Sequence, residues 1–182
     1  MVTGRGANKL VLDRLWWSIL LRDRSLSLGL RRRPQTSPCE LRMMGDLPDE
    51  RSFTDEINGS HVYDPYTKRA LFTVFREQCR LAVVLTEMVS LVFETNMFSF
   101  SSLPYESFQT TLVALGCIRA SIQSWKASTP LSQLENTDSH TAVVHFTNMT
   151  VMYYEYERPP LSRKRMLSNF GVQGCSNGTG PL

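Results

Sequence analysis

Cysteine is scarce in this chain, and its few copies lie too far apart to build a metal site or a redox pair. The 182 residues include only Cys39, Cys79, Cys117 and Cys175, and no C-x-x-C spacing occurs. Zinc fingers and dithiol redox sites depend on such close pairs. The sequence therefore predicts free thiols in a reducing compartment, with Cys79 and Cys117 buried in apolar helical stretches.

The sequence also lacks the motifs that most often mark an enzyme. It has no glycine-rich phosphate loop and no G-x-S-x-G turn. Its three histidines are scattered, and the five-residue step from His140 to His145 does not put two ligands on one helical face. We therefore expect no enzyme activity and no cofactor. A small helical enzyme or ligand-binding protein is the less favoured alternative, because catalytic residues need not be close in sequence.

Long apolar runs are absent as well. The most apolar stretch, Leu81–Phe93, spans 13 residues and contains Glu87. A membrane-spanning helix needs about 20 predominantly apolar residues. The N-terminal apolar stretch is interrupted by Asp13 and Arg14 and does not resemble a signal peptide. The sequence therefore predicts no membrane segment.

Charge is distributed unevenly along the chain. The formal net charge of +3 combines +6 over residues 1–45, −7 over residues 46–157 and +4 over residues 158–182. A basic head is compatible with nucleic-acid contact, but three adjacent arginines at 31–33 are too few for a stripe that follows DNA. We favour a solvated helix face followed by a basic turn. The runs 31–33 and 163–165 are weak matches to nuclear import signals.

Helical periodicity dominates the rest of the sequence. It predicts an all-α fold, a partial multi-helix domain of about four long helices with long loops. The expected helices cover residues 10–29, residues 66–94, a segment from Ser102–Pro104 to Pro130, and a segment from an Asp138 cap to Arg158. Residues 31–62 are expected to be mostly loop. The domain is expected to cover residues 1–160, and residues 161–182 to form a disordered tail.

The same periodicity predicts which helix faces are buried. The expected apolar stripe of the first helix is Val11, Leu15, Ile19 and Leu26, with Trp16 and Leu20 alongside, and that of the last helix is Ala142, Phe146, Met149, Tyr153 and Tyr156. The helix over 66–94 carries two stripes, so we expect it to be buried on more than one side. Asp64 is expected to cap this helix, with Pro65 in its first turn.

One segment combines rare features in a fixed order. Two adjacent tryptophans are followed by an Arg-Asp-Arg triplet, a Ser-Leu pair, a glycine and an Arg-Pro pair. The tryptophans would bury large areas and fix the helix against its neighbours. The triplet would form either a buried polar network or an exposed charge cluster worth little, and we favour the network. The residues concerned are Arg14, Trp16, Trp17, Arg22, Asp23, Arg24, Ser27, Leu28, Gly29, Arg33 and Pro34.

This order of residues resembles the middle homology region of the fungal zinc-cluster transcription factors. Residues 50–95 are similar to the cutinase-regulator branch of that family, and the resemblance covers about residues 10–160. It implies the C-terminal part of a regulatory domain that acts in the nucleus. The expected partner is another zinc-cluster transcription factor or the transcription machinery, without direct DNA contact by this chain.

The sequence departs from the family in two ways. Zinc in that family is held by an N-terminal six-cysteine cluster, and those cysteines are missing here. The family domain also extends beyond both ends of the matching segment, so the resemblance implies a truncated chain. A nonfunctional or misannotated fragment is therefore an alternative. Such a fragment would expose apolar faces of the helices at 66–94 and 142–156.

Overall fold

Every regular element that the structure describes is a helix. The computed structural model describes residues 4–30, 32–43, 46–94, 105–134 and 139–157. In chain order the elements are α1 (Gly4–Leu30), α2 (Pro38–Met43), the 3-10 helix η1 (Glu50–Phe53), α3 (Thr54–Asn58), α4 (Pro65–Glu94), α5 (Tyr105–Ser128), α6 (Leu131–Leu134) and α7 (Thr141–Glu157). The predicted all-α class is confirmed. The predicted Ser102–Pro104 start, Asp138 cap, Arg158 end and 161–182 tail lie outside the described residues.

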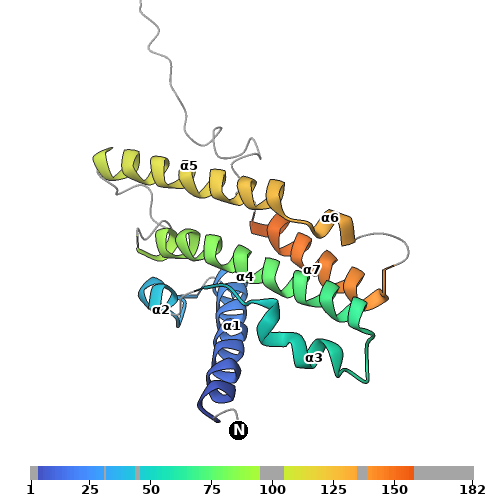
Figure 1. The fold of residues 1–182 in the computed structure, drawn as a ribbon. Coiled ribbons are helices and arrows are strands. Elements are labelled where there is room, and N and C mark those ends of the chain that lie inside the picture. The colour runs from blue at the N-terminus through green and yellow to red at the C-terminus, as the bar shows by residue number, and fades with distance from the viewer. Residues whose placement is uncertain (1–3, 31, 44–45, 95–104, 135–138, 158–182) are drawn as a thin grey trace, which may run out of the picture.

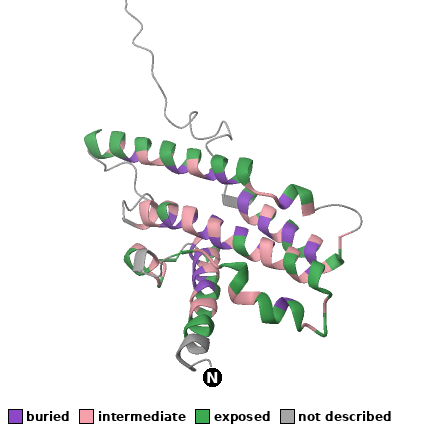
Figure 2. Ribbon diagram, viewed as in Figure 1, coloured by how far each residue is buried: buried purple, intermediate pink, exposed green. Residues whose placement is uncertain are grey.

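The longest helix, α4, is the centre of the fold. The helices α1, α5 and α7 all contact it. Figure 1 shows α5 running alongside α4, while α1 crosses α4 steeply. In Figure 2 the buried positions of α5 and α7 lie on the sides that face the other helices. The positions of α1, α5 and α7 therefore depend mainly on their contacts with α4.

Asp64 starts α4, as the sequence predicts. Its Oδ1 atom accepts hydrogen bonds from the backbone N–H groups of Tyr66 at 2.9 Å and Thr67 at 3.0 Å. The Thr67 hydroxyl donates to Oδ2 at 2.6 Å. These bonds satisfy donors that have no partner within the helix, and Pro65 occupies the first helical position, where no N–H is needed.

Two apolar clusters share α4. The main core consists of Val74, Leu81, Leu85, Ile118, Ile122, Trp125, Leu131, Val143 and Tyr154. The tryptophan core consists of Trp17, Leu20, Cys79 and Ala82. Because α4 contributes to both, the prediction that this helix is buried on more than one side is confirmed. Among the described side chains of α4, Tyr66 is the only large hydrophobic that is exposed, so this helix does not show the exposed apolar face that the fragment alternative implies.

A polar contact fixes α5 against α4. The indole Nε1 of Trp125 donates to the backbone oxygen of Glu77 at 3.2 Å. The buried Glu77 carboxylate accepts two bonds from Arg80 Nη1, each 2.9 Å long, and Arg80 Nη2 donates to Ser128 at 2.9 Å. Both tryptophan and arginine therefore tie the C-terminal end of α5 to the same turn of α4.

The apolar face predicted for α1 is the outer one, which corrects the sequence interpretation. Leu15 and Ile19 are 54% and 47% exposed, whereas Trp17 and Leu20 are buried. Residues 10–21 are apolar on nearly every side, so periodicity alone could not select a face. The buried charged residues further along α1 share the Trp17 face and decide the orientation.

The predicted stripe on α7 is displaced by about one position. The buried side chains are Val143, Thr147, Thr150 and Tyr154, whereas Phe146 is 44% exposed. Three of these four positions are polar or amphipathic, so a search for apolar residues selected their neighbours instead.

The exposure of Cys117 and the helices within residues 31–62 differ from the sequence predictions, while the burial of Cys79 agrees with them. Cys117 is exposed on α5, whereas the buried position of Cys79 is confirmed. The segment 31–62 contains α2, η1 and α3, although it was expected to be mostly loop. These helices have four to six residues, too short for a periodic signal to develop.

The reversed face of α1 predicts a contrast between two leucines. We expect Leu20→Ala to lower the free energy of unfolding by about 2–5 kcal/mol, because it empties a fully buried site. The matched variant Leu15→Ala should change it by less than about 0.5 kcal/mol. Urea denaturation followed by circular dichroism measures both, and equal losses would contradict the orientation of α1.

Candidate functional site

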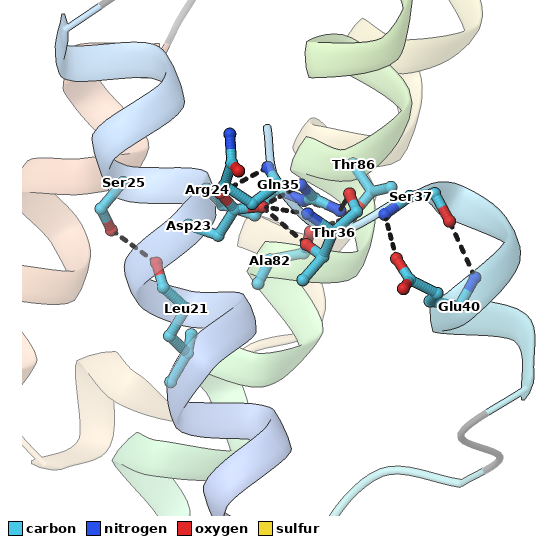
Figure 3. A network of polar contacts seen from close by, with 10 residues as sticks. All are labelled: Leu21, Asp23, Arg24, Ser25, Gln35, Thr36, Ser37, Glu40, Ala82 and Thr86. Atoms are coloured by element: carbon cyan, nitrogen blue, oxygen red, sulfur yellow. Dashed lines mark hydrogen bonds and ion pairs between the residues drawn. The ribbon is translucent and has the colours of Figure 1, made fainter. Parts of the chain in front are cut away.

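Asp23 and Arg24, two members of the Arg-Asp-Arg triplet of α1, form a buried polar network (Figure 3). The Asp23 carboxylate accepts bonds from the backbone N–H groups of Gln35 at 2.9 Å and Thr36 at 3.0 Å. The Thr36 hydroxyl adds a bond of 2.6 Å, and Arg24 Nη1 lies 3.0 Å from Oδ2. Asp23 therefore fastens the chain that follows α1 back onto the helix.

Arg24 carries the network across to α4. Only 1% of this residue is exposed, an unusual degree of burial for an arginine. Its Nε atom donates to the Thr86 hydroxyl at 2.9 Å, and Nη2 donates to the Thr36 backbone oxygen at 3.1 Å. Each nitrogen of the guanidinium group thus has a partner, which a buried cation requires.

The two charges shift each other's protonation equilibria. Desolvation raises the pKa of Asp23, but the bonds from Gln35 and Thr36, with the charge of Arg24, outweigh it and bring the pKa below 3.8. Burial lowers the pKa of Arg24, opposed by the charges of Asp23 and Glu40. Arginine still stays protonated in proteins, so the pair is ionic at neutral pH.

A capping box positions the segment after α1 to which Asp23 is hydrogen-bonded. The Ser37 backbone N–H donates to Glu40 Oε2 at 2.6 Å, and the Glu40 N–H donates to the Ser37 hydroxyl at 3.2 Å. This reciprocal pair starts α2, where Pro38 is the first helical residue. The Ser37-Pro38-Cys39-Glu40 sequence has the spacing of a capping box, although the prediction for this segment is mostly loop.

The tandem tryptophans of the motif have unequal roles. Trp17 is 3% exposed and belongs to the tryptophan core, while Trp16 is only half-buried beside it. Their rings meet edge to face with centroids 5.1 Å apart. The predicted anchoring of the helix by both rings therefore depends mainly on Trp17.

Arg14 fastens the N-terminal half of α1 to η1 and α3. Its Nη1 pairs with Glu56 at 3.1 Å, and Nη2 donates to the Ser52 backbone oxygen at 2.6 Å. The guanidinium carbon lies 4.0 Å from the centre of the Phe53 ring, a cation–π distance. Sequence reasoning placed Arg14 in the motif but gave no indication of these partners.

The remaining motif residues do not join the network. Ser27 is buried with an unpartnered hydroxyl, and Leu28 packs on the main core. Gly29 is exposed with open space around its Cα, so no close approach demands a glycine there. Arg22 and Arg33 are exposed and Pro34 is half-buried. The residues that the sequence missed are Thr36 and Thr86, for which the spacing of the motif gives no signal.

The described residues offer few groups that could hold a metal ion or react as a nucleophile. No group of three or more His, Cys, Asp or Glu side chains within them is placed to hold a metal ion. Cys39 and Cys117 are exposed on different helices, so they do not fit a zinc cluster. Burial raises the pKa of Cys79 to about 12, which keeps its thiol protonated and unreactive. No described helix is both long and apolar enough to cross a bilayer.

Comparisons with known proteins give no relative for this arrangement. No protein-family model matches the chain, no curated protein is significantly similar to it, and no solved structure matches its fold. The resemblance to the zinc-cluster regulators therefore depends on the sequence features described above.

The network predicts that replacing Arg24 destabilises the fold much more than replacing Arg22. Arg24→Met should lower the free energy of unfolding by about 3 kcal/mol, because it leaves the Asp23 carboxylate buried without its countercharge. The adjacent Arg22→Met replaces an exposed side chain and should cost less than about 0.5 kcal/mol. Chemical denaturation of both variants tests this, and similar losses would rule out a buried ionic network.

The lowered pKa of Asp23 predicts a specific pH dependence. Since the folded pKa lies below the ordinary 3.8, the ionised carboxylate stabilises the fold fully above about pH 5. That contribution is lost as the pH falls through 3.8 toward the folded pKa. Unfolding free energies measured from pH 7 to pH 2 should therefore show the gap between the wild type and Asp23→Asn closing on acidification. A gap that stays constant would contradict the assignment.

Proposed function

We propose that this chain is a regulatory, non-DNA-binding part of a fungal zinc-cluster transcription factor and acts in the nucleus. The observation that supports the proposal is that one set of motif residues is buried between helices. Trp17, Asp23, Arg24 and Ser27 share the buried face of α1 and dock it on α4. An ordered motif of this kind is what a regulatory helical domain needs to hold a fixed shape.

The proposed activity is contact with other proteins. The buried polar groups of Asp23, Arg24 and Glu77 hold helices together. The proposed partner is another zinc-cluster transcription factor or the transcription machinery. Zinc in the full-length relatives would belong to their own cysteine cluster, and the chain described here would contribute no ligand to it.

A tethered reporter assay tests this function. The full chain is fused to an unrelated DNA-binding domain and expressed in fungal cells beside a reporter that carries the matching operator. We expect nuclear accumulation and a change in reporter transcription relative to the DNA-binding domain alone. Arg24→Met should abolish the change because it breaks the network that docks α1 on α4.

The matched control is Arg119→Met, which replaces an exposed arginine of α5 and should keep the full reporter response. Immunoblots must show equal protein levels for all variants. A stable chain that stays out of the nucleus, or that leaves the reporter unchanged, would contradict the proposal.

A further inference from the structure

An open groove runs between α1 and α7, with α4 as its floor. Its volume is about 690 Å³. Leu26 lies on the α1 wall, and Met149 and Tyr153 lie on the α7 wall, while Phe75 and Leu81 belong to the floor. Both wall helices contact α4. The groove is therefore a channel between helices, and its floor is part of the core.

The α1 rim of the groove is an apolar seam with the spacing of a helix-packing surface. Its members that line the groove are Ile19, Arg22 and Leu26. Leu12 and Leu15 continue the same alternating steps of three and four residues toward the N-terminus of α1, outside the groove lining. Knobs-into-holes packing between helices uses this spacing. Leu12 is 61% exposed, and Leu15 and Ile19 are also largely exposed. The α7 rim adds Phe146, which is 44% exposed.

Most polar side chains in the groove are already satisfied within the chain. The hydroxyls of Ser18 and Ser25 each donate to the carbonyl of the preceding turn at 2.9 Å. On the floor, Gln78 Nε2 donates to the Thr150 hydroxyl at 2.9 Å. These groups therefore have little left to offer a small polar ligand, and the groove presents mainly apolar surface.

Arg22 is the exception. It lines the groove and is exposed, and within the described part of the chain its guanidinium has no hydrogen-bond or ion-pair partner. Arg24, the other arginine that lines the groove, is neutralised by Asp23 at 3.0 Å. Among the described residues that line the groove, Arg22 is thus the one uncompensated positive charge, and it belongs to the same rim as the apolar Ile19 and Leu26.

We propose that this groove binds an amphipathic helix of a partner protein whose apolar face bears one carboxylate opposite Arg22. The α1 wall from Ser18 to Leu28 is roughly 15 Å long at 1.5 Å per residue, which matches about three helical turns. A helix laid in the groove would bury Ile19 and Phe146 and give Arg22 its missing anion. The proposal stands on the shape and charge of the groove and does not depend on the proposed role in transcription.

Fluorescence anisotropy with a designed probe tests the groove. The probe is a fluorescein-labelled amphipathic peptide of about 14 residues, with leucines at three- and four-residue steps and one glutamate among them. A second peptide has lysine in place of that glutamate. We expect the full chain to bind the glutamate peptide at least about threefold more tightly, and Arg22→Glu to reverse the preference.

Two single-residue variants, one in the groove and one outside it, test whether the peptide binds in the groove. Phe146→Ser should weaken binding by about tenfold or more, because it removes an apolar side chain that the peptide buries. Leu112→Ser on α5 is the matched control, since Leu112 is also 44% exposed but lies outside the groove. Circular dichroism must show the same helix content for both variants, which separates a binding defect from unfolding.

Three results would overturn the proposal. The first is no binding of either peptide by a folded monomer. The second is binding that responds equally to Phe146→Ser and Leu112→Ser or ignores the charge exchange at Arg22. The third is a dimer, detected by light scattering, that Phe146→Ser dissociates, because a second copy of the chain would then occupy the groove.

Discussion

The structure depends on the requirement that a buried guanidinium group must be fully paired. Arg24 has left water almost completely, and an unpaired cation there would destabilise the fold severely. Its partners come from three parts of the chain: Asp23 on α1, Thr36 after it and Thr86 on α4. Satisfying one side chain therefore fixes the rotation of α1, the path of the chain beyond it and the contact with α4.

The sequence predicted the features that depend on local chemistry. The all-α class, the Asp64 cap, the double-sided burial of α4 and the polar network at Asp23 were all predicted correctly, since caps and strong periodicity act within a few residues. The buried faces of α1 and α7 were not predicted correctly. Both helices bury polar side chains, such as Arg24 and Thr147, whose partners come from distant segments, and a search for apolar stripes discounts them.

The orientation of α1 also explains where the groove comes from. Because Trp17 and Arg24 occupy the inward face, the leucines and isoleucine of the opposite face remain at the surface. If α1 were rotated to bury Leu15 and Ile19, more apolar surface of this helix would be removed from water. The same rotation would separate Arg24 from its partners on α4 and in the segment after α1. The network thus maintains an exposed apolar seam that hydrophobic burial alone would remove.

Two of the three groups that donate to Asp23 besides Arg24 are backbone amides, at positions 35 and 36. A backbone amide is supplied by every residue type except proline. Position 35 can therefore vary widely in sequence without loss of its bond, whereas Asp23 and Arg24 cannot. The link between α1 and α2 is consequently encoded mainly on the α1 side. We expect related chains to keep the acid–base pair and to vary more at position 35 than at Thr36, whose hydroxyl also donates to Asp23.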